Sequence, residues 1–258
     1  MRYLLLLVML CLSVEATPPN LLRELGARRR AAAQVAFPTN GLVAYWSFDS
    51  VSGNTVEDTF GDNDGTAVGE PLFGTEYGVN GDGVRLVAAE TQSITVTHDD
   101  SLNFTASSFS ISAWFNTSTT GVRQFIASKR DENTGDGGYS LRVNEDSKIR
   151  AGVGRGGNNT FFSTIGTYAD GQWHHVVFVG SRDANAMYLY VNGVLDATSG
   201  AWSTRPMDTT NNFTIGNEPD SVGFFNGSLD EIAIWNRALT DDEVSEIYND
   251  GKGRFYTP

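Results

Sequence analysis

The chain has 258 residues, of which 40% are hydrophobic and only 19% are charged, and 28 are glycine. A chain of this length can bury a core, and its formal net charge of −13 disfavours nucleic acid and anionic lipid as partners. The single cysteine, Cys11, excludes a zinc–cysteine site and a redox motif. The acidity is explained either by solubility or by carboxylates that gather around a cation such as calcium.

Residues 1–16 have the features of a secretory signal peptide. Arg2 gives a positive start, residues 4–12 are almost wholly apolar, and small residues at Val14 and Ala16 suit a signal peptidase. The apolar run is too short to span a membrane, and no other run approaches 18 residues. We therefore expect a secreted, extracellular protein without a membrane span.

Residues 17–40 form a segment of a different character. Pro18 and Pro19 open it, and three consecutive arginines at 28–30 precede a run of alanines. The segment is either a linker or a propeptide that is cut after the arginines. We expect the folded domain to occupy residues 41–255.

From residue 41, short segments of β-branched and aromatic residues alternate with turns rich in glycine, asparagine and aspartate. Residues 109–115 show the period of two that is typical of a strand, and Asn192-Gly193 predicts a tight hairpin. The predicted strands are residues 42–48, 93–97, 109–116, 124–129, 139–143, 148–153, 173–179, 187–191, 213–216 and 228–235.

The one clear helix signal lies near the C-terminus. Thr240 and Glu243 form a capping box, Val244 and Ile247 begin an apolar face, and Gly251 is expected to end the helix. Many strands and one helix, without alternation of strands and helices, exclude a parallel α/β fold. The pattern predicts an all-β sandwich of two antiparallel sheets with one short C-terminal helix.

Several motifs, in order along the chain, resemble the landmarks of laminin-G-like domains. The motifs are LVAYWSFD at 42–49, GNTVED at 53–58, DNDGT at 62–66, FSISAWF at 109–115, DGQWHHVV at 170–177, YLYVNG at 188–193 and GSLDEIAIWNRALT at 227–240. The resemblance implies a concanavalin A-like jelly roll. It also implies an extracellular binding role, often for carbohydrate and often with calcium, although the family includes adhesive modules, lectin-like domains and accessory domains of glycosidases.

Similar family members bind calcium at positions that match Asp49 and Asp230. The terminal strands of a jelly roll can run side by side, so these two carboxylates can meet, and the loop at 62–66 can add Asp64 and Thr66 as oxygen ligands. The alternative is that Asp49 caps a turn and Asp230 holds a loop by hydrogen bonds. Asp230 stands among apolar residues, where a carboxylate needs a partner, and both interpretations supply one.

Trp202 and Phe224 lie between predicted strands and are candidates for stacking on a sugar ring. The alternative is that such aromatic residues close the end of the sandwich. Five Asn-X-Ser/Thr sequons are possible glycan sites if the source is eukaryotic. They begin at Asn103, Asn116, Asn158, Asn212 and Asn226.

Catalysis has little support in the sequence. The Glu-X-Asp-X-X-Glu run of laminarinase-like relatives is missing, and so is a Gly-X-Ser-X-Gly elbow. His174 and His175 are adjacent, so on a strand they point to opposite faces and do not easily share a zinc ion.

The prediction is thus a secreted, calcium-assisted carbohydrate-binding or adhesion domain without catalytic activity, whose partner is an extracellular glycan or glycoprotein. The alternatives are a structural or protein–protein interaction module that calcium only stabilises and, with less support, a polysaccharide-active enzyme.

Overall fold

The computed structural model describes residues 36–105, 107–130, 137–155, 158–202, 207–219 and 222–258. The predicted signal peptide and most of the segment at 17–40 lie outside these residues. The described fold belongs to one unit, Phe37–Pro258. Within that described part, no helix is both long enough and apolar enough to cross a membrane.

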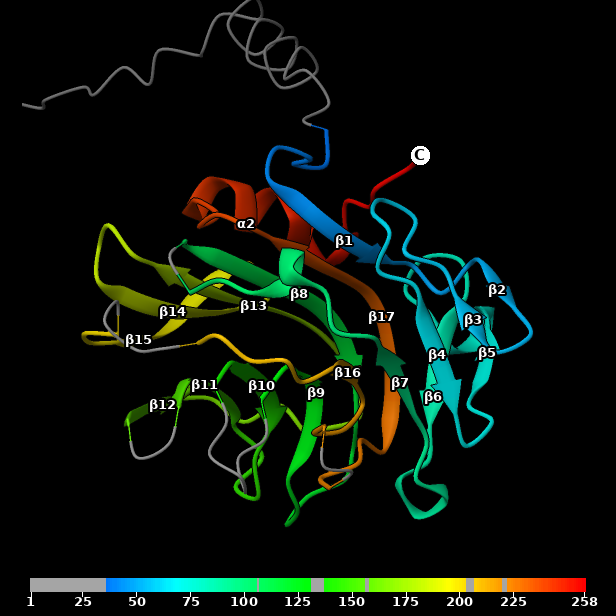
Figure 1. Cartoon of the computed structure of the whole chain (residues 1–258). Helices are drawn as coiled ribbons and strands as arrows, with labels where there is room; N and C mark the ends of the chain where they lie inside the picture. The colour runs from blue at the N-terminus through cyan, green and yellow to red at the C-terminus, as the bar shows by residue number, and fades with distance from the viewer. Residues whose placement is uncertain (1–35, 106, 131–136, 156–157, 203–206, 220–221) are drawn as a thin grey trace, which may run out of the picture. The chain divides into compact units, whose positions relative to one another are not determined.

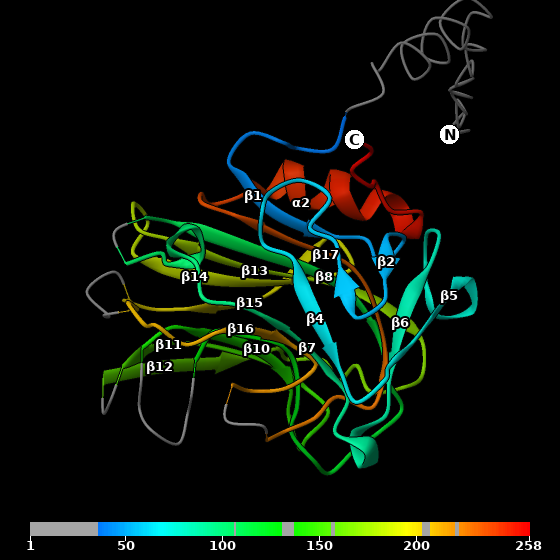
Figure 2. The ribbon, with the colours of Figure 1, turned by 45° about the vertical axis from the view of Figure 1, so that its right-hand side comes forward.

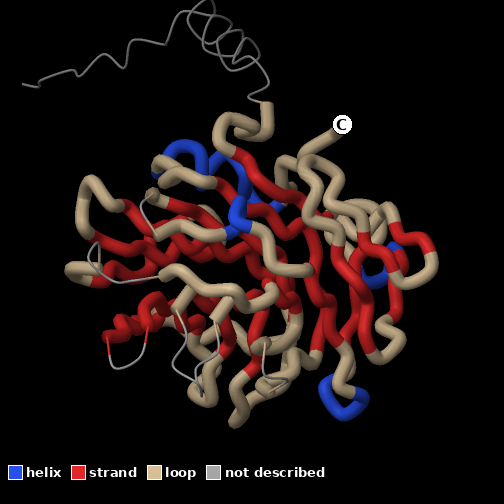
Figure 3. The backbone as a smooth tube through the Cα atoms, in the orientation of Figure 1, coloured by secondary structure: helices blue, strands red, loops and turns tan. Residues whose placement is uncertain are grey.

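Strands dominate the described residues and form two antiparallel sheets (Figures 1 and 3). The first sheet has the order β15 (Val194–Ser199), β14 (Ala186–Val191), β13 (Trp173–Ser181), β8 (Phe109–Asn116), β17 (Gly227–Trp235), β6 (Gly83–Leu86) and β5 (Leu72–Gly74), and β1 (Leu42–Trp46) also pairs with β17. The second sheet has the order β12 (Asn158–Ser163), β11 (Ile149–Arg155), β10 (Tyr139–Val143), β9 (Gln124–Ser128), β16 (Phe213–Ile215), β7 (Ser93–Val96), β4 (Gly65–Val68), β3 (Thr55–Val56) and β2 (Val51–Ser52).

The helices are few and short. The α-helix α2 spans Asp241–Tyr248, and the 3₁₀ turns are η1 (Thr75–Tyr77), η2 (Ala88–Glu90), η3 (Asp100–Leu102) and η4 (Asn249–Gly251). This arrangement confirms the predicted two-sheet sandwich with one short C-terminal helix. All ten predicted strands are present, and the predicted hairpin implied the start of β15, whereas the sequence missed β2 to β6 and β12, which are short or carry weak alternation.

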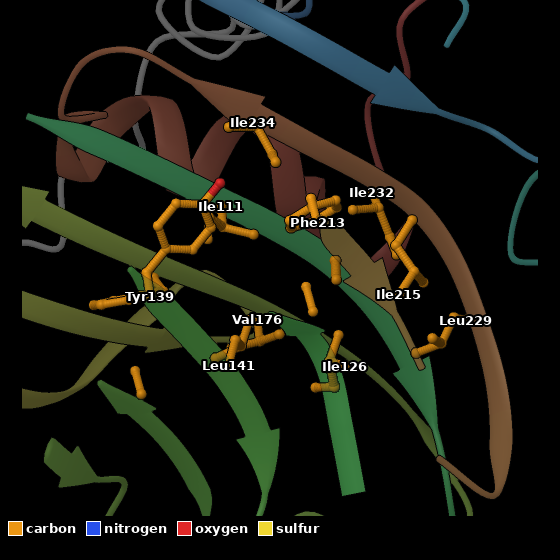
Figure 4. Close-up of a cluster of buried hydrophobic side chains, with 14 of the residues drawn as sticks. Ile111, Ile126, Tyr139, Leu141, Val176, Phe213, Ile215, Leu229, Ile232 and Ile234 are labelled. Carbon is orange, nitrogen blue, oxygen red and sulfur yellow. The ribbon is translucent and has the colours of Figure 1, made fainter. Parts of the chain in front are cut away.

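Side chains from the two sheets meet in a continuous core. Ile111 and Ile234 from the first sheet face Leu141, Ile126 and other residues of the second (Figure 4). These side chains are fully buried because alternate residues of each strand point toward the opposite sheet. Removing such apolar surface from water is the main force that holds the two sheets together.

The helix α2 lies over the outer face of the first sheet (Figure 2), and a second apolar cluster is buried between the helix and that face. Val244 and Ile247 of the helix pack against Val177 and Trp235, among others. The serines of β8 face this side, as the alternation predicts, but they are buried. Ser110 forms hydrogen bonds with the segment that leads into the helix. Its hydroxyl donates to Arg237 O (2.9 Å) and accepts from Leu239 N (2.9 Å).

The ends of α2 follow local signals, with one difference from prediction. The Thr240 hydroxyl accepts from Glu243 N, and the Glu243 carboxylate accepts from Thr240 N, which confirms the capping box. The predicted stop at Gly251 is wrong, because the helix ends at Tyr248 and Asn249 adopts the left-handed conformation (φ 49°) there. Asparagine tolerates this conformation better than most residues, so it takes the position that glycine usually fills.

The predicted hairpin at Asn192-Gly193 is present between β14 and β15. Val191 pairs with Val194, and both turn residues have positive φ (52° and 75°). A two-residue turn of this type matches the twist of the strands that it joins.

Candidate functional site

A β-bulge in β17 sets the position of Asp230. Asp230 pairs with Trp114 of β8, but the next regular pair is Ala233 with Ser112, so one extra residue stands between them. Glu231 within the bulge has a positive φ of 53°. The bulge places two adjacent acidic side chains, which are 0% and 4% exposed, at the junction of β17 with the loop before β6.

The Asp230 carboxylate holds that loop through backbone amides. Its Oδ2 accepts from Val79 N (2.7 Å) and Asn80 N (3.2 Å), and its Oδ1 accepts from Glu231 N (2.9 Å). Residues 79 and 230 are therefore joined across 151 positions of sequence. A buried carboxylate requires such donors because burial removes its hydration.

Glu231 is bound by two side-chain donors. Its carboxylate accepts from the Tyr45 hydroxyl of β1 and, at 2.8 Å, from Asn80 Nδ2. The Tyr45 oxygen in turn accepts from Tyr256 N (3.1 Å). Sequence reasoning missed Glu231, Asn80 and Tyr45. The adjacent acids at 230 and 231 were the available signal, but the bulge that turns both into one site is invisible in the sequence.

Asp49 holds the other end of the same turn. It follows β1, and its Oδ1 accepts from Asp82 N at 2.6 Å. Gly81 lies so close to this carboxylate that a Cβ there would stand 2.0 Å from Asp49 Oδ1. The sequence predicted that Asp49 and Asp230 can meet, and in the structure their carboxylates bind the two ends of the turn at residues 79–82. We call Asp49, Asp230 and Glu231 the acidic clamp.

Burial dominates the electrostatics of the acidic clamp. It raises the pKa of Asp230 to about 9, with a further rise from the charge of Glu231, although three backbone amides act in the opposite direction. Burial also raises the pKa of Glu231 to about 7. In the part of the chain that the structure describes, no lysine or arginine forms an ion pair with either residue. The two buried carboxyl groups thus have amides and the Tyr45 hydroxyl as partners.

Asp64 and Thr66 are less closely associated with the clamp. Asp64 lines a hollow of about 650 Å³ together with Asp49, and its Oδ1 accepts from Asp58 N (2.9 Å). Thr66 belongs to β4 and not to a loop, and it pairs with Thr55 and Thr95 in the ladder. Among the described residues, no three histidine, cysteine, aspartate or glutamate side chains are grouped closely enough to hold a metal ion.

A second hollow, of about 360 Å³, lies over β4, β7 and β16 of the second sheet. These three strands are neighbours in that sheet and lie side by side in Figure 2. Phe224, Pro219 and Val68 supply its apolar lining. Its polar lining consists of Thr91, Ser93, Thr95, Asn212, Thr214 and Asn217. The volume falls within the range of about 300–1,000 Å³ that is usual for ligand pockets, and we call this site the neutral hollow.

Phe224 and the two asparagines of the neutral hollow differ in solvent exposure and in hydrogen bonding. Phe224 is half-buried, Asn212 is exposed, and Asn217 is only 4% exposed. The Asn212 oxygen accepts from His98 N (3.0 Å), whereas the Asn217 side-chain oxygen accepts no hydrogen bond from the described residues. Phe224 was a candidate from the sequence, but the asparagines, which flank β16, were not recognised as ligand contacts, because the hollow forms only where β16 lies beside β7 and β4.

The suggestion that Trp202 stacks on a ligand is wrong. Its side chain is 0% exposed, and its Nε1 donates to Ser181 O (3.1 Å) and Ala186 O (2.9 Å). Its ring also packs edge-on against Phe109 in the core. Trp202 therefore closes the sandwich, which was the alternative interpretation, because a tryptophan buries much apolar surface while its N–H finds an acceptor.

The adjacent histidines have separate hydrogen bonds on opposite faces of β13. His174 contacts the Asp170 carboxylate at 3.0 Å and the Asn192 side chain at 3.1 Å. His175 Nε2 lies 2.7 Å from the Ser112 hydroxyl, and burial lowers the pKa of His175 to about 3. Both residues have a structural, hydrogen-bonding role in this geometry.

These features define the class of the protein: a two-sheet jelly roll with an acidic clamp at its terminal strands and a polar hollow on its second sheet. The chain belongs to the concanavalin A-like lectin/glucanases superfamily, whose laminin G family model matches residues 89–245.

Two human proteins have related segments. Adhesion G-protein coupled receptor D1 is 35% identical over 96 residues, which cover 36% of this chain and 10% of the receptor. Pentraxin-4 is 33% identical over 86 residues, which cover 30% of this chain and 18% of pentraxin-4. The matched segments thus span a small part of either relative.

Solved structures with a similar fold include toxin domains. The binding domain of Paraclostridial Mosquitocidal Protein 1 has a TM-score of 0.66 at 20% identity, covering 82% of this chain and 52% of that domain. The binding domain of Botulinum Neurotoxin DC in complex with SialylT has a TM-score of 0.63 at 16% identity, covering 81% and 51%. At these identities the likeness shows the fold.

Proposed function

We propose that this chain is a secreted, non-catalytic binding module that recognises carbohydrate on an extracellular glycan or glycoprotein. The observation that carries the proposal is the neutral hollow, where a half-buried phenylalanine stands beside threonine, serine and asparagine side chains. Sugar sites combine an apolar surface for the ring with a few placed polar groups for the hydroxyls. The family and the binding domains of similar fold support a binding role.

The absence of catalysis is part of the proposal. Hydrolysis of a glycosidic bond commonly requires two carboxylates that flank the bond, about 5–10 Å apart. The buried acids Asp230 and Glu231 are held by the loop at 79–80 and by Tyr45, and neither lines the neutral hollow. This placement supports binding without turnover.

Calcium, in this proposal, stabilises the acidic clamp. The ligands present suit a hard cation in kind, because Asp49, Asp230 and Glu231 offer carboxylate oxygens around the turn at residues 79–82. Since no three acidic side chains form a closed group among the described residues, carbonyls and water would complete the shell. The ion would favour the ionised form of the buried carboxyl groups, whose pKa values burial raises, and would fasten β1 and β17 to the turn between them.

A structural or protein-binding module is the second candidate. It is favoured by β15, which lies at the edge of the first sheet and carries Val194 and Leu195 at 68% and 45% exposure. An open strand edge with apolar side chains can pair with a segment of another protein.

A glycan array probed with the secreted full chain, in millimolar calcium and again in chelator, tests the proposal. We expect reproducible binding of glycans in calcium and weaker binding in chelator, because loss of the ion loosens the clamp. Binding that is equal in both conditions would contradict the role of calcium. A blank array in both conditions would contradict carbohydrate recognition and favour the protein-binding candidate.

A further inference from the structure

Among the residues that the structure describes, the lining of the neutral hollow carries no charged side chain. Its described polar residues are hydroxyls and amides, and its apolar residues are Phe224, Pro219 and Val68. A site without cationic groups does not compensate the cost of removing a carboxylate or sulfate from water.

Asn217 gives the hollow a second, independent feature. It is 4% exposed, belongs to the lining, and its Oδ1 accepts no hydrogen bond from the residues that the structure describes. Its backbone oxygen is fixed by the Thr214 hydroxyl (2.8 Å), which in turn lines the hollow. Buried acceptors normally have a donor, so this amide is suited to a hydroxyl that comes from a ligand. The terminal torsion of asparagine is soft, so the oxygen can turn toward that hydroxyl.

We infer that the neutral hollow binds an uncharged pyranose ring, with Phe224 against the apolar face of the sugar and Asn217 as acceptor for a ring hydroxyl. This inference rests on the proposed function and specifies its ligand class and its subsite. The net charge of −13 acts in the same direction, because it repels sialylated, sulfated and uronic acid glycans.

Three variants test the subsite. Phe224→Ala removes the stacking surface, Asn217→Ala removes the acceptor, and Thr95→Gln extends a side chain into the hollow from the half-buried, outward position of β7. The matched control is Phe60→Ala. Phe60 is also a partly exposed aromatic residue (38%), but it packs edge-on against Tyr256, outside the hollow.

The array glycan with the highest signal is titrated into the wild type and the variants by calorimetry. We expect a neutral glycan, a loss of about tenfold or more for Phe224→Ala and a smaller loss, up to about tenfold, for Asn217→Ala. Thr95→Gln should also weaken binding, and Phe60→Ala should leave it unchanged. Because Asn217 is buried, melting curves accompany each variant, and Thr95→Gln supplies the answer if Asn217→Ala does not fold.

The outcomes separate this inference from the proposed function. Preference for acidic glycans would overturn the ligand class, and glycan binding that Phe224→Ala and Thr95→Gln leave unchanged would overturn the subsite. In both cases the proposed carbohydrate binding would stand. An array without any bound glycan would overturn the proposed function and this inference together.

Discussion

Two buried aspartates show that the same kind of hydrogen bonding can order a local loop or join distant parts of the chain. Asp58 is 4% exposed and accepts from the backbone amides of Tyr45, Phe60, Gly61 and Asn63, so it organises a loop close to it in sequence. Asp230 also accepts backbone amides, but it stands beside a second buried acid, Glu231. We therefore expect a cation to stabilise Asp230 and not Asp58.

Substitution Asp230→Ala should lower the melting temperature more in calcium than in chelator. An ion present at about 100 times its dissociation constant contributes roughly 2.7 kcal/mol, which corresponds to about 5–10 °C in a domain of this size. Differential scanning fluorimetry in both conditions measures the difference. The control, Asp58→Ala, removes a buried aspartate with local partners and should cost the same in both. An equal loss for Asp230→Ala in both conditions would contradict ligation.

His175 should make the fold sensitive to acid. Burial lowers the pKa of this residue to about 3, whereas the unfolded chain binds a proton below about 6.5. The stabilisation is therefore complete above pH 6.5 and is lost as the pH falls toward 3, by at most about 1.4 kcal/mol per pH unit.

Urea denaturation at pH 7.5 and pH 4.5 measures this dependence. The raised pKa values of Asp230 and Glu231 act in the opposite direction, because these groups stabilise the fold as the pH falls, but they do so in both proteins. We therefore expect the wild type to lose stability relative to His175→Gln between pH 7.5 and pH 4.5, since glutamine still offers Ser112 a polar partner without binding a proton. An unchanged difference between the two proteins at both pH values would contradict the role of His175.

Elements far apart in sequence are joined in the first sheet, and α2 covers its outer face. The helix has only eight residues, so its stability depends on its cap and on packing against the sheet. Arg237 reinforces the cap by two 2.7 Å contacts with the Glu243 carboxylate. The helix end and the sheet thus share one polar network.

Thr240→Ala should lower the free energy of unfolding by about 1 kcal/mol, in the usual range of about 0.5–2 kcal/mol for loss of an N-cap side chain. Chemical denaturation at neutral pH is the measurement. Ser245→Ala is the matched control, since Ser245 is exposed in the middle of the same helix and alanine has high helix propensity there. A similar loss for both variants would contradict the role of the cap.

At the scale of the whole molecule, the surface determines which of the five sequons can carry a glycan in the folded state. Asn116 Nδ2 donates to Gly171 O (3.0 Å), and Asn226 Nδ2 donates to Thr119 Oγ1 (2.8 Å). Asn212 is exposed, and its hydrogen bond with His98 uses only the oxygen. The side chain of Asn158 lies outside the described residues, and Asn103 is half-buried.

For protein secreted by eukaryotic cells, we predict higher glycan occupancy at Asn212 than at Asn116 and Asn226. A glycan at either of those two would break the hydrogen bond made by the modified nitrogen. Peptide mapping by mass spectrometry measures occupancy at each site. Higher occupancy at Asn116 or Asn226 would contradict the prediction.

Because Asn212 lines the neutral hollow, enzymatic removal of its glycan should strengthen binding of added glycans.

The sequence by itself determined the features that depend on neighbours in the chain. Alternation in residues 109–115 predicted β8, the Asn192-Gly193 pair predicted the hairpin of β14 and β15, and Thr240 with Glu243 predicted the start of α2. Each signal is local because backbone geometry and local hydrogen bonds act over a few residues. The tertiary structure alone decided the bulge at Glu231 and the clamp of Asp49 and Asp230 on one turn. It also decided the burial of Trp202 and the meeting of Phe224 with Asn217. Alternation along a strand predicts which side chains face inward. Which residues become neighbours depends on how the strands pair, and that pairing is selected by the packing of the whole core.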